Sequence, residues 1–278
     1  MTVEALIAQL EELSAPAPSV VKLLGLLNRV DLDNDAVVEV VRTDVVLSAK
    51  MLALVNSAYF APPSPVESLN EALFFLGYEQ VHRLAVAIGL GGIMNRKAAG
   101  YAMDEGEFWR HSLLTAKAGE LVARDWRKSE ANVGYTAGLL HDIGKLVLNQ
   151  TLDRGSQEQM RRAIEERGQA GLVAEQNLLG TNHAEVGAAL LRKWNLPEHI
   201  VEAVEFHHEH AGSEERLPAV IALADGMAHI AASGVSGLTE TTEKDLLERL
   251  QIERTKYEEL LGEVSAALEE IETVAAVR

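Results

Sequence analysis

Residues 138–148 read GLLHDIGKLVL, an apolar run in which His141, Asp142 and Lys145 are embedded. The apolar residues recur at steps of three and four, which predicts a core helix. On one helix His141 and Lys145 share a face, and Asp142 lies about 100° further round. Burying a polar group without a partner costs roughly 2–7 kcal/mol, so each of these side chains must meet a partner. The stretch therefore predicts a helical core that carries a polar site.

Helical periodicity runs through almost the whole chain, and neither strand alternation nor a low-complexity tract interrupts it. Asp44 precedes VVLSAKMLALV as a predicted N-cap, and Ser68 with Glu71 has the form of a capping box. Gly77 is placed to end the helix that begins there. We therefore expect an all-α protein.

Three segments are expected along the chain. The periodicity is lost at 95–105 (NRKAAGYAMDE), which separates an N-terminal helical lobe at 1–105 from a second helical lobe at 106–232 that carries most of the histidines. A C-terminal helical segment occupies 233–278 and is rich in charged, mainly acidic residues at 240–273. We expect these residues to form a pair of solvated helices packed on the domain, or alternatively an arm that binds a partner or a second copy.

Composition narrows the class of protein. The 278 residues include no cysteine and carry a net charge of −17, from 25 Lys and Arg against 42 Asp and Glu. A metal site must therefore use His, Asp or Glu. The negative charge argues against binding nucleic acid or a membrane surface and favours protein or small-molecule partners. The start, MTVEALIAQL, lacks the features of a signal peptide, so we expect a cytoplasmic protein.

Two helical stretches carry candidate metal ligands. Glu107 and His111 are four residues apart, so on a helix they share a face and could reach one metal ion. His183 follows Asn182, a predicted N-cap whose capping-box partner is Glu185. The positive end of the helix dipole favours neutral imidazole there, which is the form that binds metal.

Further candidates lie among apolar residues. His207 and His208 end an amphipathic stretch, and Asp225 stands alone in AVIALADGMAHIA. This carboxylate needs a cation or strong donors, of which His229, one turn on, is the simplest. Gly144 costs a helix about 1 kcal/mol relative to alanine. Close approach of another backbone or of a bound ion would explain its presence, and close helix packing would explain it too.

In order and type these residues resemble the metal ligands of the HD superfamily of metal-dependent phosphohydrolases. The residues that carry the resemblance are His111, His141, Asp142, His183, His207, His208 and Asp225. Glu107 and Lys145 extend it to the HD-GYP branch, the cyclic di-GMP phosphodiesterases, where that glutamate serves a third metal and that lysine lies near the phosphate. The chain departs from this branch because HHEHAGSEER lacks the Gly-Tyr-Pro that would follow HHE.

The segment from Ser14 to about His210 resembles an HDOD domain, the HD-related output domain of bacterial signalling proteins. The resemblance rests on PAPSVVKLLGLLN, RTDVVLSAKMLALVNSAYF, SLNEALFFLGYEQVHRL, FWRHSL, AGLLHDIGKLVL and HAEVGAALLRKWNLPEHIVEAVEFHH. HDOD domains are generally held to be non-catalytic, often because ligand positions have been lost. This chain departs from that expectation, because every ligand type is present.

The resemblance implies a signalling protein that acts by binding a protein partner or a small phosphorylated ligand, with a homodimer as one arrangement. It also implies divalent transition metal, two ions of iron or manganese rather than zinc. The alternative function is a metal-dependent phosphohydrolase acting on a nucleotide or cyclic dinucleotide, with Asp142 and Lys145 as its catalytic residues. A metal-free, hydrogen-bonded network is the remaining interpretation of the same residues.

Overall fold

The structure is a computed structural model that describes residues 3, 6, 17–26, 34–165 and 171–276. Within these ranges all regular elements are helices, apart from one isolated bridge between Ala98 and Met103. The all-α prediction is therefore confirmed. Most of MTVEALIAQL and the start of the HDOD-like segment lie outside the described residues.

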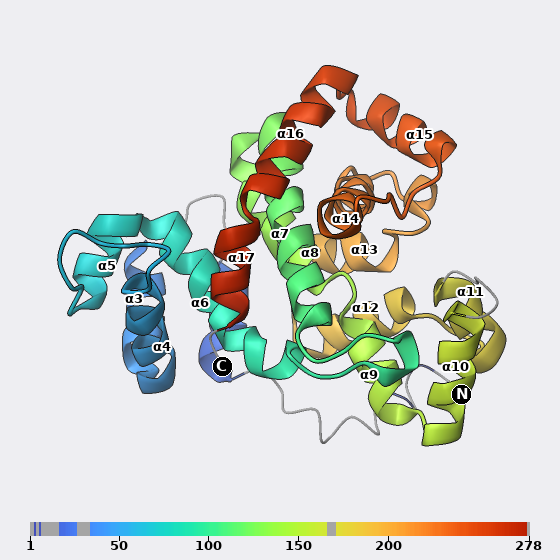
Figure 1. The fold of residues 1–278 in the computed structure, drawn as a ribbon, viewed down its shortest axis with the longest axis horizontal. Helices are drawn as coiled ribbons and strands as arrows, with labels where there is room; N and C mark the ends of the chain where they lie inside the picture. Colours follow the sequence, from blue (N-terminus) through green and yellow to red (C-terminus); the bar gives the residue numbers. More distant parts are fainter. Residues whose placement is uncertain (1–2, 4–5, 7–16, 27–33, 166–170, 277–278) are drawn as a thin grey trace.

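The N-terminal helices begin and end where the sequence signals predict. They are α2 (Pro18–Leu26), α3 (Asn34–Thr43), α4 (Val45–Val55), α5 (Leu69–Leu76) and α6 (Tyr78–Met94). The Asp44 side chain accepts a hydrogen bond from Leu47 N, and the Ser68 side chain accepts one from Glu71 N. Gly77 ends α5 at a φ of 79°, a backbone conformation that glycine adopts without strain. These helices lie at one end of the molecule (Figure 1).

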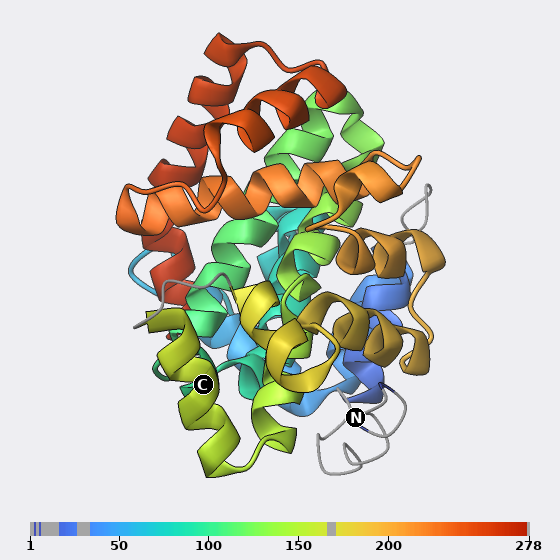
Figure 2. The ribbon, with the colours of Figure 1, turned by 90° about the vertical axis from the view of Figure 1, so that its right-hand side faces the viewer.

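The histidine-rich part is built around α7, the longest of its helices. Its elements are η2 (Ala99–Tyr101), α7 (Glu107–Trp126), η3 (Lys128–Glu130), α8 (Ala131–Leu140), α9 (Ile143–Thr151), α10 (Arg154–Glu165), α11 (Gly171–Leu179), α12 (His183–Lys193), α13 (Glu198–Glu205), η4 (His210–Gly212) and α14 (Leu217–Ser233). α14 packs across both α7 and α8 (Figure 2). Glycines let α7 and α8 approach each other closely. A Cβ at Gly119 or Gly138 would lie 2.5 Å from a carbonyl oxygen of the other helix.

The predicted helix over 138–148 is interrupted. α8 ends at Leu140 and α9 begins at Ile143, so His141 and Asp142 occupy the junction. The His141 ring donates from Nδ1 to the carbonyl of Gly138 at 2.8 Å. In an unbroken helix that carbonyl would accept from the amide of residue 142. The expectation of one continuous helix was wrong, and the break places both side chains on the same polar site.

The C-terminal segment forms three helices rather than the expected pair: α15 (Glu240–Leu250), α16 (Arg254–Ala266) and α17 (Leu268–Ala275). They pack on the domain, and α17 contacts both α7 and α6. One buried core runs through all three predicted segments, so their division into separate domains stays a prediction. Among the described residues, no helix is both long and apolar enough to cross a membrane.

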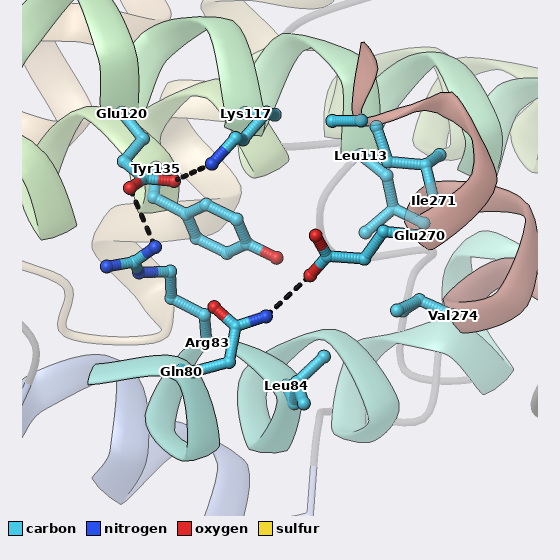
Figure 3. Close-up of a pocket in the computed structure, with 11 residues that line it drawn as sticks. Gln80, Arg83, Leu84, Leu113, Lys117, Glu120, Tyr135, Glu270, Ile271 and Val274 are labelled. Atoms are coloured by element: carbon cyan, nitrogen blue, oxygen red, sulfur yellow. Dashed lines mark hydrogen bonds and ion pairs between the residues drawn. The ribbon is translucent and has the colours of Figure 1, made fainter. Parts of the chain in front are cut away.

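Beneath α17 lies a cavity of about 30 Å³ (Figure 3). Arg83 forms a buried ion pair with Glu120 at 2.7 Å, and the Gln80 amide donates to Glu270 at 2.5 Å. The ring of Tyr135 lies between these two interactions. The residues that line this cavity include no histidine, so it is separate from the site described next.

Candidate metal centre

Ligand-type side chains converge from α7, the α8–α9 junction, α12, the segment after α13, and α14. They form three groups whose candidate ligand atoms lie within 4.8 Å of one another: Asp142, His183, His207 and His208; His111, His141 and Asp142; and His111, Asp225 and His229. Seven of the eight predicted metal ligands are thus brought together. Glu107 is the exception.

Glycine lets α9 and α12 come together beneath this cluster. A Cβ at Gly144 would overlap the carbonyl oxygen of His183 and lie 2.8 Å from the amide of Gly187. Close approach of another backbone, one of the expected reasons for Gly144, is therefore confirmed. The approach brings Asp142 and His183 side by side.

Asp142 lies between two histidine groups, with one carboxylate oxygen toward each. Oδ1 is 3.1 Å from His183 Nε2 and 4.0 Å from His207 Nε2. Oδ2 is 3.3 Å from His141 Nε2 and 3.8 Å from His111 Nε2. A carboxylate in this position could bridge two metal ions.

Hydrogen bonds fix how three of the imidazoles face the centre. Nδ1 of His141 donates to Gly138 O at 2.8 Å, and Nδ1 of His207 donates to Val204 O at 2.7 Å. Nδ1 of His183 donates to the Glu175 carboxylate at 2.8 Å. In a neutral ring the free lone pair is then on Nε2, which faces the cluster. Such bonds to the outer nitrogen orient histidines that bind metal.

His207 offers the cluster a buried nitrogen that suits a cation. Burial lowers the pKa of His207 well below its usual value, and the neighbouring His208, His141 and His183 lower it further. The ring is therefore neutral, and its buried Nε2 has no hydrogen-bond partner. His141 Nε2, Asp142 Oδ1 and Asp225 Oδ1 are likewise buried without one. A metal ion would satisfy these atoms.

The protonation states of the charged side chains in the cluster depend on one another. Burial alone would raise the pKa of Asp142, but His141 and Lys145 hold it well below its usual range. Burial would lower the pKa of His183, but the Glu175 carboxylate raises it to about 9. Without metal, protons on these rings balance the carboxylates. A bound cation would take over that role.

Lys145 lies at the edge of the cluster. Its Nζ is 2.5 Å from Asp142 Oδ2, and its side chain is 16% exposed. Burial would lower the pKa of Lys145, but Asp142 and Asp225 raise it, so the ammonium stays charged. The group could face an anion next to Asp142, as the sequence predicted.

Asp225 connects the cluster to a further histidine, His229, which lies on α14 like Asp225 itself. Its Oδ1 is 3.1 Å from His111 Nε2 and 3.5 Å from His229 Nε2. His229, expected only as the simple partner of Asp225, also joins a potential ligand group with His111. Asp225 therefore lies close to imidazole nitrogens from two helices.

The spacing of these atoms fits metal coordination. Two ligands at about 2.1 Å from one ion, separated by an angle of about 90–110°, lie roughly 3.0–3.4 Å apart. The nitrogen to oxygen distances of 3.1 Å for His183 with Asp142, 3.1 Å for His111 with Asp225 and 3.3 Å for His141 with Asp142 fall in this range. Imidazole and carboxylate ligands suit iron, manganese or zinc.

The structure does not bring Glu107 to the cluster. Glu107 is the first residue of α7, it is exposed, and its Oε2 accepts a hydrogen bond from Asp104 N at 2.7 Å. The spacing to His111 is as predicted, but the carboxylate is bound to the turn that precedes the helix. The sequence analysis missed Glu175, a lone carboxylate in GLVAEQNLL that contacts His183.

The fold and the cluster together define an all-helical protein with groups of His and Asp side chains that could hold metal ions. An HDOD domain model matches residues 13–210, so the chain belongs to the HDOD family. The match includes every member of the cluster except Asp225 and His229.

The chain is also similar to individual proteins. It is 26% identical over 194 residues to an uncharacterized protein from Treponema pallidum, covering 66% of this chain and 36% of the relative. The chain thus spans about a third of that relative's length. An HDOD domain protein of unknown function from Geobacter sulfurreducens has a structure with a TM-score of 0.76 and 24% identity, covering 99% and 97% of the two chains.

A second solved structure has the same fold. It belongs to a protein from Marinobacter aquaeolei whose name assigns it provisionally to signal transduction. The TM-score is 0.81 at 21% identity, and the match covers 98% of this chain and 61% of the other. At this level of identity the likeness establishes the fold alone.

Proposed function

We propose that this protein is a metal-binding signalling module that acts by binding a protein partner or a small ligand. Two divalent ions, iron or manganese, would be held on either side of Asp142. His183, His207 and His208 would serve one ion, and His111, His141 and Asp225 the other. Membership of the HDOD family supports the signalling role. The Marinobacter aquaeolei protein, by its name, has a role of the same kind.

His208 is the exposed member of the cluster, and the charge around it favours the binding of a partner or ligand over the hydrolysis of a phosphate ester. A hollow of about 150 Å³ reaches His208 and is lined by Glu185, Glu205 and Glu209, with no Lys or Arg among its lining residues. Arg192 pairs with Glu205 at 2.6 Å but does not line the hollow. Carboxylates at this approach would repel a phosphate ester. This is the observation that ranks the signalling role above hydrolysis.

The alternative function is a metal-dependent phosphohydrolase acting on a nucleotide or cyclic dinucleotide. The arrangement that favours it is Asp142 with an oxygen toward each histidine group and Lys145 beside it. Bound metal would supply a Lewis acid and an activated water. Asp142 would hold both ions, and Lys145 would bind the phosphate oxygen.

A turnover assay separates the two functions. The full chain is incubated with a panel of nucleotides and cyclic dinucleotides, cyclic di-GMP included, in the presence of manganese or iron. We expect no metal-dependent product, and none from cyclic di-GMP in particular because the Gly-Tyr-Pro segment is missing. Steady product formation that disappears in Asp142→Ala would place the enzyme first.

A further inference from the structure

Glu175 is a buried carboxylate whose described partners all connect to the metal centre. It lies on α11 with no exposed surface. Its oxygens accept hydrogen bonds from the backbone amide of His183 at 2.7 Å, from His183 Nδ1 at 2.8 Å and from the Tyr101 hydroxyl at 2.6 Å. Burying a carboxylate is costly unless several donors satisfy it. Its position is therefore specific to His183 and Tyr101.

The contact with Glu175 determines what His183 presents to the cluster. Because Nδ1 is held by the Glu175 carboxylate, the ring cannot rotate without losing that hydrogen bond. Nε2 is then directed toward Asp142 Oδ1 at 3.1 Å and toward His208 Nε2 at 2.9 Å. Glu175 thus holds the ring in the orientation that a metal ligand needs.

Tyr101 brings the segment between the two lobes into the same network. It ends η2, within the 95–105 stretch where helical periodicity is lost. The neighbouring Gly100 amide donates to Asn149 Oδ1 at 2.9 Å, and Asn149 Nδ2 donates to Lys97 O at 3.2 Å. The Tyr101 ring also lies 5.9 Å from Lys145 Nζ. This segment is therefore tied to α9 and, through Tyr101, to the ligand His183.

We propose that Glu175 and Tyr101 are positioning residues of the metal centre. Glu175 fixes His183 in its ligating orientation, and Tyr101 couples the segment at 95–105 to that ligand. The inference rests on the proposed metal binding and extends it. It identifies a route by which metal occupancy changes the order of a segment outside the cluster.

Titration of the full chain with Mn²⁺ tests the positioning role. Removing an outer hydrogen bond to a ligating histidine typically weakens metal binding about 10–100-fold, and we expect such a loss in Glu175→Gln. Tyr101→Phe should weaken binding in the same direction by a smaller factor. Glu120→Gln and Tyr135→Phe are matched controls, since both residues are buried but neither belongs to the metal groups (Figure 3). Their Mn²⁺ affinity should equal that of the wild type.

Hydrogen exchange of the amides at 98–103 supplies a second measurement that a merely structural role would not change. Mn²⁺ should slow this exchange in the wild type and have no effect on it in Tyr101→Phe. If Glu175→Gln does not fold, Tyr101→Phe decides the matter by both measurements. A wild type that binds no Mn²⁺ would refute the metal centre itself. A wild type that binds Mn²⁺ with the same affinity as both variants would refute only the positioning role.

Discussion

At the scale of single residues, Asp142 is where the two histidine groups meet, so it gives the sharpest test of metal binding. If Asp142 binds metal, Asp142→Ala should destabilise the metal-loaded protein by about 1.4 kcal/mol for each tenfold loss of affinity. In a metal-free network the same change would cost about 1–3 kcal/mol with or without metal. Thermal melts of wild type and variant, each with Mn²⁺ and with EDTA, distinguish these outcomes. Equal shifts in both conditions would contradict metal binding by Asp142.

His82 gives a separate, pH-dependent test outside the cluster. It is fully buried on α6, and its Nε2 donates to Leu23 O at 3.2 Å. Burial lowers the pKa of His82 from 6.5 to about 4, so between these pH values the unfolded chain takes up a proton that the folded protein refuses. Above pH 6.5, His82 should therefore make no contribution to the change of the free energy of unfolding with pH. It should fall by about 3 kcal/mol as the pH drops to 4.

The matched variant for this test is His82→Gln, which keeps an amide donor for Leu23 but does not titrate. Urea unfolding at pH 7 and at pH 4 gives the free energies of both proteins. We expect the wild type to lose about 3 kcal/mol more than the variant across this interval. Equal losses would show that His82 is not held neutral by burial.

The sequence predicted the ligand types and left their partners undetermined. His141 and Asp142 were identified because polar groups in apolar stretches are conspicuous, and His111 was identified by its spacing from Glu107. Glu175 was missed because its partners lie in other elements, His183 eight residues away and Tyr101 74 residues away, so no spacing within one helix connects them. Glu107 has the predicted spacing from His111, but its carboxylate accepts a hydrogen bond from the amide of Asp104 instead of reaching the cluster.

At the scale of elements, helix starts and ends followed local signals, whereas the helix break at His141 and Asp142 did not. The caps at Asp44, Ser68 and Asn182 lie where predicted, since each depends on residues three positions apart. The break occurs in a run with continuous helical periodicity. It coincides with a ring-to-carbonyl hydrogen bond that periodicity alone does not reveal.

Gly144 gives the prediction that belongs to this scale. In Gly144→Ala the added Cβ would overlap His183 O, so α9 and α12 must separate. We expect a loss of about 2 kcal/mol or more, since overpacking outweighs the gain in helix propensity of about 1 kcal/mol. Gly262→Ala on α16 is the control, because its Cβ would meet nothing within 4 Å and the change should not destabilise. Denaturant melts that show equal stabilities for the two variants would contradict the close approach.

At the scale of the whole molecule, one continuous core holds the ligands in place. α14 packs across α7 and α8, and in this way Asp225 reaches His111 although 114 positions separate them in the chain. Of the C-terminal helices, α15 packs on α14, α16 on α7 and α14, and α17 on α6 and α7, where α17 closes the cavity beside Tyr135 (Figure 3). Helices packed on the domain were the first expectation for this segment. The alternative, an arm that binds a partner or a second copy, stays a prediction.

The number of ions is a property of this whole assembly, and we expect more than one per chain. Seven of the predicted ligands and His229 gather in three groups, which is more than one ion of four to six ligands requires. The two oxygens of Asp142 face different histidines, so one ion could not use all of them. Elemental analysis of protein purified without chelator or a His-tag gives the stoichiometry. Metal at background level, even after reconstitution with iron or manganese under reducing conditions, would instead favour the metal-free network, in which protons on the histidines balance the buried carboxylates.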